Sequence, residues 1–127
     1  MDCIRPHVLL VEDDVELRTA LAMLLQSDGN VVTPAEDALH AVSRAVREHP
    51  DLIILDLGLP GGGGFTVMER LKMGKAGTIP VLILTGSAEE SNRERAAQLG
   101  ACEFMLKPAE PRELLAAVRR LVRREAA

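Results

Sequence analysis

Short apolar runs alternate along this chain with longer segments in which apolar residues recur every three to four positions. Each run is apolar at consecutive positions, which is typical of a strand whose two faces are both covered. The longer segments have the period of amphipathic helices. Helices that connect parallel strands cross over with one handedness, so they divide between the two faces of the sheet. The pattern predicts an α/β fold with five strand–helix units around one parallel sheet.

The spacing of apolar and capping residues sets the limits of the predicted elements. We expect strands at 7–11, 30–33, 51–56, 81–84 and 102–106, and helices from after Asp13 to about Asp28, from Pro34 to before Pro50, over 65–73, over 89–99 and from Pro111 onward. Thr33–Glu36 has the pattern of a capping box with proline in the first helical position. The helix that follows carries an inward stripe of Leu39, Val42 and Val46. The 89–99 helix has a thin apolar face and should be weakly anchored.

Polar side chains stand at the carboxyl ends of four of the predicted strands. Glu12 and Asp13 follow the first strand, and Asp56 ends the third. Thr85 and Lys107 follow the last two strands. Ligands of open parallel sheets bind beyond the carboxyl ends of the strands. We therefore expect a functional site at this edge of the sheet.

The three acids, Glu12, Asp13 and Asp56, point to a cation. Two like charges about 4 Å apart repel by roughly 4 kcal/mol at an effective dielectric of 20. The carboxylates therefore need a bound cation or a raised pKa to lie together. An all-oxygen site with access to water suits Mg²⁺. The alternative is that Asp13 caps the first helix and Asp56 caps a turn.

The hydroxyl and the amine suit an anionic ligand. Thr85 can donate a hydrogen bond to an anionic oxygen, and the small Gly86 leaves room for one. Thr85 could instead cap a helix, but the Ser87–Glu90 segment is the better capping box and leaves Thr85 for the site. Lys107 ends an apolar strand, where an amine is costly unless it pairs with a carboxylate or a phosphate. The alternative is a solvated loop lysine.

Composition narrows the class of protein. A chain of 127 residues fits one domain, and no apolar stretch is long enough to span a membrane. The first residues lack the apolar core of a signal peptide, so we expect a cytoplasmic protein. Cys3 and Cys102 have no metal-ligand spacing and are expected to be buried.

Charge and aromatic content argue against direct binding of nucleic acid. The formal net charge is −4, and the aromatic residues are two phenylalanines. The last predicted helix carries Arg119, Arg120, Arg123 and Arg124. We interpret these arginines as a solvated face whose charges offset the helix dipole.

The ordered set of motifs resembles the receiver domain of two-component response regulators. It consists of the acidic pair Glu12–Asp13, Asp56 with Pro60 four residues on, Thr85 before a small residue, and Lys107–Pro108. The resemblance covers essentially the whole chain. It implies a single receiver domain over residues 1–127 with a doubly wound (βα)5, flavodoxin-like fold and strand order 2-1-3-4-5.

The resemblance also implies a role for each site residue. Asp56 would be the phosphoacceptor, and Thr85 and Lys107 would contact the phosphoryl group. Glu12 and Asp13 would hold Mg²⁺, with Asp13 the direct ligand, helped by the Asp56 carboxylate and the backbone carbonyl of Gly58. Gly86 and Ser87 would neighbour the phosphoryl pocket. Because Gly58 and Ser87 are small, we expect little shielding from water and a short phosphoryl lifetime.

The family's switch corresponds here to Thr85 and Phe104, with an output face on the fourth helix, fifth strand and fifth helix. Two departures stand out. Gly63–Gly64 occupies the point where the family often has an Asp–Gly pair, so we expect a third helix without a side-chain cap and a loose Gly61–Gly64 loop. Ala109 stands where phenylalanine is common, which affects packing beneath the last helix.

The implied function is a signalling domain that catalyses only its own phosphotransfer and dephosphorylation. Its donor would be a sensor histidine kinase or a histidine phosphotransfer domain, its output an effector domain or protein, and homodimerisation stays open. One rival is a phosphohydrolase of the haloacid dehalogenase type, but the chain lacks the Asp-x-Asp pair of that class. The other is a receiver-like binding module that acts without phosphorylation.

Overall fold

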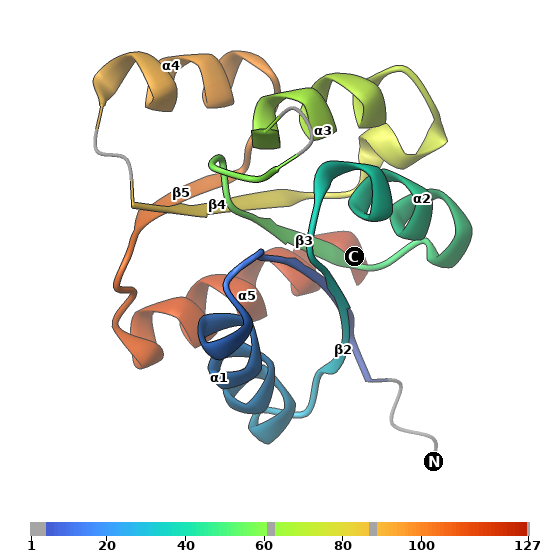
Figure 1. Ribbon diagram of the computed structural model, residues 1–127. Coiled ribbons are helices and arrows are strands. Elements are labelled where there is room, and N and C mark those ends of the chain that lie inside the picture. The colour runs from blue at the N-terminus through green and yellow to red at the C-terminus, as the bar shows by residue number, and fades with distance from the viewer. Residues whose placement is uncertain (1–4, 61–62, 87–88, 127) are drawn as a thin grey trace.

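Five parallel strands form the centre of the protein in the computed structural model, in the order β2-β1-β3-β4-β5 (Figure 1). The structure describes residues 5–60, 63–86 and 89–126, with side chains to residue 122. The strands are β1 (His7–Val11), β2 (Val31–Ala35), β3 (Leu52–Leu55), β4 (Val81–Thr85) and β5 (Glu103–Leu106). The predicted fold class and strand order are confirmed.

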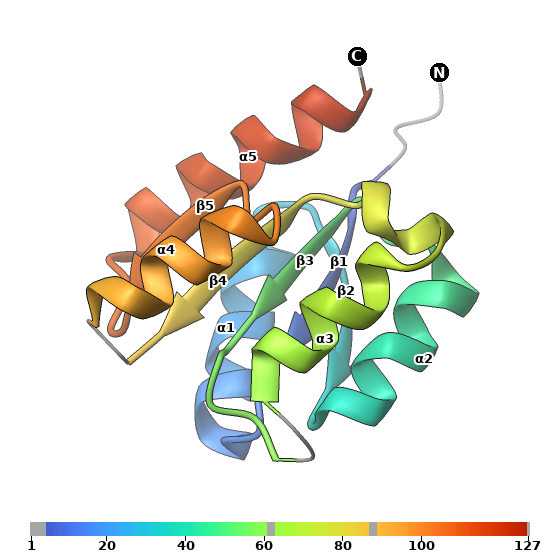
Figure 2. The ribbon, with the colours of Figure 1, turned by 90° about the horizontal axis from the view of Figure 1, so that it is seen from above.

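Helices cover both faces of the sheet (Figures 1 and 2). They are α1 (Val15–Ser27), α2 (Ala38–Glu48), α3 (Gly63–Lys72), α4 (Glu90–Gln98) and α5 (Pro111–Ala126), with a 3₁₀ turn η1 (Lys75–Thr78). Successive strand residues point to opposite faces, so the strands feed two cores. Leu10 and Ile54 pack toward α1 and α5. Leu9 and Ile53 pack toward α2, α3 and α4. Among the described helices, none is long and apolar enough to cross a membrane.

The start of α2 differs from the sequence prediction. β2 continues through Pro34 to Ala35, and α2 begins only at Ala38. The N-cap is Asp37, whose Oδ1 accepts a hydrogen bond from the backbone N of His40 at 2.8 Å. β2 lies at the edge of the sheet, where a strand tolerates a proline that has no N–H. The predicted Thr33–Glu36 capping box is therefore wrong.

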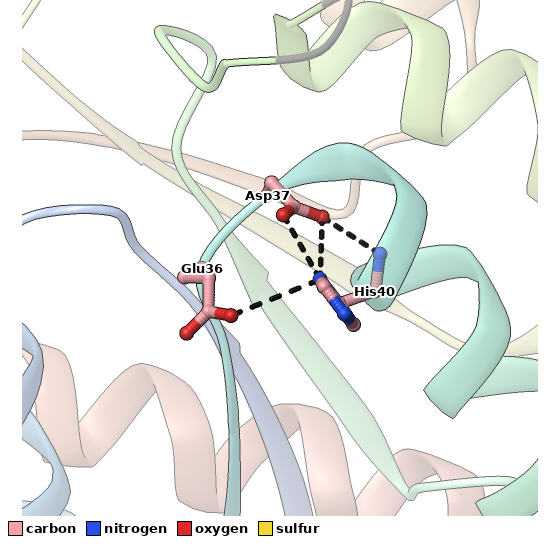
Figure 3. Close-up of side chains that lie close together, drawn as sticks. All are labelled: Glu36, Asp37 and His40. Carbon is pink, nitrogen blue, oxygen red and sulfur yellow. Dashed lines mark hydrogen bonds and ion pairs between the residues drawn. The ribbon is translucent and has the colours of Figure 1, made fainter.

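The same cap explains a group of potential metal ligands at the start of α2 (Figure 3). The imidazole Nδ1 of His40 lies 2.9 Å from both carboxylate oxygens of Asp37 and 3.8 Å from Oε1 of Glu36. These contacts hold the first turn of α2 together. Both carboxylate oxygens of Asp37 are thus already engaged in contacts with His40 at the helix cap.

The buried face of α2 is also not the predicted one. Ala38, Ala41 and Ala45 are buried, whereas Leu39 is 73% and Val46 is 63% exposed. Alanine lets the helix axis approach the sheet and α3 closely, and the larger apolar residues are left facing outward. Of the predicted stripe, Val42 packs partly against the core, whereas the inward placement of Leu39 and Val46 is wrong.

Two smaller predictions also fail. α4 begins at Glu90 with Glu89 as N-cap and no capping side chain, so the Ser87–Glu90 capping box does not start it, and Ser87 lies outside the described residues. Cys102 is exposed rather than buried because it precedes β5, an edge strand. Cys3 and the side chains of Arg123 and Arg124 also lie outside the described residues. The thin face of α4 is as expected, since Ala96 is its buried residue.

Candidate functional site

The register of the sheet brings the polar strand ends together. Val11 pairs with Leu55, and Leu55 pairs with Ile83. Thr85 pairs in turn with Leu106. The residues that end or follow these strands therefore meet at one edge of the sheet, as the sequence predicts.

Lys107 connects two of the predicted acids. Its Nζ lies 2.5 Å from Oε1 of Glu12 and donates a hydrogen bond of 2.9 Å to Oδ2 of Asp56. The side chains of Glu12 and Asp56 are only 3% and 10% exposed, and that of Lys107 is 22% exposed. Buried charges need partners, and this trio supplies them. The expectation that Lys107 pairs with a carboxylate is confirmed.

Burial and pairing shift the pKa values of Glu12 and Lys107. Burial raises the pKa of Glu12 above its ordinary value, and hydrogen bonds from Lys107 and from the backbone N–H of Asp14 offset only part of the rise. Burial by itself lowers the pKa of Lys107, but its hydrogen bonds to Glu12 and Asp56 outweigh that effect, and the pKa is raised. Lys107 is therefore a firmly held cation facing two carboxylates.

Asp13 completes a three-carboxylate cluster. One carboxylate oxygen each from Glu12, Asp13 and Asp56 lies within 4.8 Å of the others, and Asp13 is exposed. The helix-capping role weighed for Asp13 belongs instead to Asp14, whose Oδ1 accepts from the backbone N of Leu17 at 3.2 Å. Asp13 is thus left to face water beside two buried acids. An all-oxygen cluster of this kind fits Mg²⁺.

Asp56 also makes a local turn contact. Its Oδ1 accepts a hydrogen bond from the backbone N of Gly58 at 3.2 Å, so the turn-capping alternative is correct for this oxygen. Oδ2 is engaged by Lys107. The turn therefore orients the Asp56 carboxylate toward the other strand ends without using both oxygens.

Thr85 and Gly86 lie at the end of β4. Thr85 is 2% exposed, and its backbone oxygen accepts from the backbone N of Lys107 at 2.9 Å, which joins the ends of β4 and β5. Around Gly86 an added Cβ would meet no atom within 4 Å, so this position leaves open space beside the strand ends. Ser87, the other expected pocket neighbour, is not among the described residues.

Phe104 is half-buried and packs against the core that faces α4. The guanidinium carbon of Arg93, from α4, lies 4.7 Å from the centre of its ring, a cation–π contact. Phe104 therefore packs partly inward, and an arginine from α4 covers its ring.

Gly64 and Arg18 are positioning residues that the sequence reasoning missed. A Cβ on Gly64 would lie 2.5 Å from the backbone O of Asp56, so only glycine allows α3 to approach this strand end so closely. Gly63 has a φ of 78°, and the Gly64 backbone N donates to the O of Leu57 at 2.9 Å. Gly63 and Gly64 thus belong to the first turn of α3, whereas Gly61 and Gly62, the rest of the Gly61–Gly64 loop, lie outside the described residues. Arg18 donates to the backbone O of Glu12 at 2.7 Å and fixes the loop after β1.

Known proteins resemble this chain in sequence and in structure. The phosphate regulon transcriptional regulatory protein PhoB of Escherichia coli is 37% identical over 119 residues, which are 93% of this chain and 52% of PhoB. The signal receiver domain of a putative LuxO repressor protein from Vibrio parahaemolyticus superposes with a TM-score of 0.91 at 29% identity, covering 97% of this chain and 94% of that one. The BeF3-activated receiver domain of RstA from Klebsiella pneumoniae gives 0.86 at 32% identity, covering 92% and 98%.

The sequence model of the response regulator receiver domain matches residues 8–119, which include β1 from Val8 onward and the whole of β2 to β5. The chain spans about half the length of the curated relatives it matches. The strand order and the position of the acidic site agree with the resemblance seen in the sequence. The chain belongs to the response regulator receiver domain family.

Proposed function

We propose that this chain is the phosphoacceptor domain of a two-component system and that Asp56 receives the phosphoryl group. The observation that carries the proposal is the contact of the Lys107 ammonium with Oδ2 of Asp56, at the strand ends that also carry Glu12 and Asp13. A carboxylate held between a lysine and two further acids at an accessible edge is suited to group transfer. A binding module that acts without phosphorylation, the other candidate, would not require this arrangement of acids and lysine.

In the proposed reaction, a carboxylate oxygen of Asp56 attacks the phosphorus of a phosphohistidine. A new O–P bond forms while the P–N bond breaks, and the histidine leaves with the bonding electron pair and takes up a proton. Negative charge that gathers on the phosphoryl oxygens needs nearby donors. Lys107 supplies a positive charge there, and Thr85 supplies a hydroxyl at the neighbouring strand end.

The residues present also fit Mg²⁺. Glu12, Asp13, Asp56 and the backbone carbonyl of Gly58 would hold the ion, with Asp13 the most accessible of the acids. When bound, Mg²⁺ neutralises charge on the transferring phosphoryl group and on the carboxylates. The three carboxylates lie close enough to repel one another, and Lys107 contacts only two of them. A bound cation would offset the remaining repulsion.

The proposal includes a donor and an output. A sensor histidine kinase or a histidine phosphotransfer domain would supply the phosphoryl group, and hydrolysis by water would remove it. The phosphorylated state would change the face formed by α4, β5 and α5 through Thr85 and Phe104. An effector domain or a separate output protein would respond to that change.

Acetyl phosphate with Mg²⁺ tests the central step. We expect the intact mass to rise by one phosphoryl group, and Asp56→Asn to abolish the rise. Asp13→Asn should reduce labelling strongly, whereas its neighbour Asp14→Asn, which keeps a good helix cap, should not. Undiminished labelling of Asp56→Asn would overturn the proposal. A phosphorylated form that lasted many hours would contradict the expected short lifetime.

A further inference from the structure

Helix α2 exposes an apolar stripe made of Leu39, Val42 and Val46. Leu39 is 73% and Val46 is 63% exposed, and Val42 is half-buried. The spacing of three and four residues places all of them on one side of the helix. α2 lies at the outer edge of its layer, with α3 on one side and none of the described helices on the other (Figure 2). Leu39 and Val46 therefore face outward, and Val42 lies at the border of the stripe, where it packs partly against the core.

A shallow groove lies beside the Leu39 and Val42 part of this stripe. It has a volume of about 220 Å³ and lies between α2 and α3, lined by Leu39 and Val42 together with Thr66 and Arg70. The larger apolar residues Leu39 and Val46 are exposed on this outer side, whereas the buried residues of α2 are alanines. Exposed apolar surface grouped in this way marks an interaction site more often than isolated exposed residues do.

The two ends of α2 carry opposite charge. Glu36 and Asp37 lie at the amino end (Figure 3), and the exposed Arg47 lies at the carboxyl end. Glu48 is also at the carboxyl end, but its Oε1 accepts a hydrogen bond from Thr33 at 2.9 Å and so is turned toward β2. Along the axis of α2 the order is therefore acid, apolar residues, base.

We propose that a second copy of this chain docks on the α2 stripe, with the two α2 helices antiparallel. About a two-fold axis near Val42, Leu39 would pack on the partner's Val46, and Glu36 would lie opposite the partner's Arg47. An isologous contact needs a surface that complements itself. Opposite charges at the two ends of α2 face each other when the two helices are antiparallel, whereas like charges would meet if they were parallel.

This dimer goes beyond the proposed phosphoacceptor function and does not depend on it. Its surface is on α2 and α3, apart from the output face on α4, β5 and α5. A stripe of three apolar residues per copy is small compared with stable interfaces, which bury about 1,200–2,000 Å². We therefore expect a weak monomer–dimer equilibrium that depends on concentration.

Sedimentation equilibrium of the 127-residue chain, up to about 1 mM, tests the proposal. We expect reversible dimerisation, and we expect Leu39→Glu to weaken it at least tenfold. Val15→Glu is the matched control, because Val15 is 63% exposed on a helix of the opposite face. A chain that stays monomeric at 1 mM would overturn the proposal. So would a dimer that Leu39→Glu leaves unchanged, since another face or another occupant would then be responsible.

A charge exchange tests the antiparallel arrangement. Glu36→Arg and Arg47→Glu should each weaken the dimer, and the double variant should restore it, because the opposite charges again face each other. Failure of the double variant to recover would overturn the arrangement.

Cross-linking gives an independent measurement. In a Cys3→Ser, Cys102→Ser background, Val42→Cys should form an intermolecular disulfide on oxidation, since the two copies of residue 42 meet near the axis. Met23→Cys, 66% exposed on α1, is the control and should not form one. Equal cross-linking at both positions would show random collision and overturn the arrangement.

Discussion

The ammonium nitrogen of Lys107 lies 2.9 Å from Oδ2 of Asp56, although 51 positions separate the two residues in the chain. The contact spans the sheet from the end of β5 to the end of β3, with β4 between them. Lys107 also holds Glu12, so a single cation balances two buried carboxylates. The consequences of removing that cation are the most direct test of the site.

Lys107→Met should lower the free energy of unfolding by about 2 kcal/mol, because it leaves Glu12 and Asp56 close together without their cation. The same change should raise the affinity for Mg²⁺ by roughly tenfold, since the ion no longer competes with the ammonium. Urea unfolding with and without Mg²⁺ measures the first effect, and calorimetric titration measures the second. If Mg²⁺ stabilises this variant no more than the unaltered chain, the electrostatic account of the site is wrong.

Gly64→Ala should destabilise the protein by about 1–3 kcal/mol, because its Cβ would lie 2.5 Å from the backbone O of Asp56. The shift of that strand end should also reduce labelling by acetyl phosphate. The control is Gly74→Ala, where an added Cβ meets no atom within 4 Å, and its effect should stay within about 0.5 kcal/mol. Thermal unfolding compares the two variants, and equal losses would contradict the close approach of α3.

Arg119→Ala should reduce stability in a manner that depends on pH. Arg119 donates to both carboxylate oxygens of Asp28, and this hydrogen bonding lowers the pKa of Asp28 below its ordinary value of 3.8. A lowered pKa contributes stability above the ordinary value and loses it as the pH falls through the lowered one. The difference between the variant and the unaltered chain should thus be constant from pH 7 to 5 and shrink below pH 3.8.

The urea midpoint of unfolding at several pH values measures this difference. Because both side chains are partly exposed, 1 M salt should also diminish it. Arg112→Ala is the control on the same helix, since its guanidinium has no ion pair among the described residues. A difference that grew as the pH fell would have the wrong sign for this ion pair.

The double variant Arg93→Ala, Arg95→Ala should speed amide hydrogen exchange in α4. This helix buries Ala96, and its two arginines cover the rings of Phe104 and Phe65 at 4.7 and 4.4 Å. If the loss of these cation–π contacts lowers the free energy of opening of α4 by about 1 kcal/mol, its amide exchange rates should rise about fivefold. Amides of α1 in the same sample are the control. Equal acceleration in α1 would show global unfolding instead of local opening.

The sequence was sufficient for the fold and for most of the site. Consecutive apolar residues in β3 mark a strand buried on both faces, and acids and amines at strand ends are costly unless they serve a site. Both features can be recognised from neighbouring residues in the sequence, and the structure contains both the buried strand and the polar strand ends. Gly64 was missed because nothing in a glycine pair shows which backbone atom lies against it.

Helix α2 shows where local reasoning fails. Leu39, Val42 and Val46 form as good an apolar stripe as Ala38, Ala41 and Ala45, and periodicity cannot say which one faces the core. The choice depends on how closely α2 must approach β1 and α3. The helix start failed for a similar reason, since Pro34 suits a first helical turn and an edge strand equally well.

The sequence by itself determined the alternation of strands and helices, the parallel sheet and the identity of the polar residues at its carboxyl edge, because these follow from hydrophobic period and from the cost of burying charge. The tertiary structure decided which oxygen meets which nitrogen. Lys107 bridges Glu12 and Asp56, Asp14 rather than Asp13 caps α1, and α2 turns its alanines inward. Such outcomes depend on distances between residues far apart in the chain, which only the packing of the sheet and its helices defines.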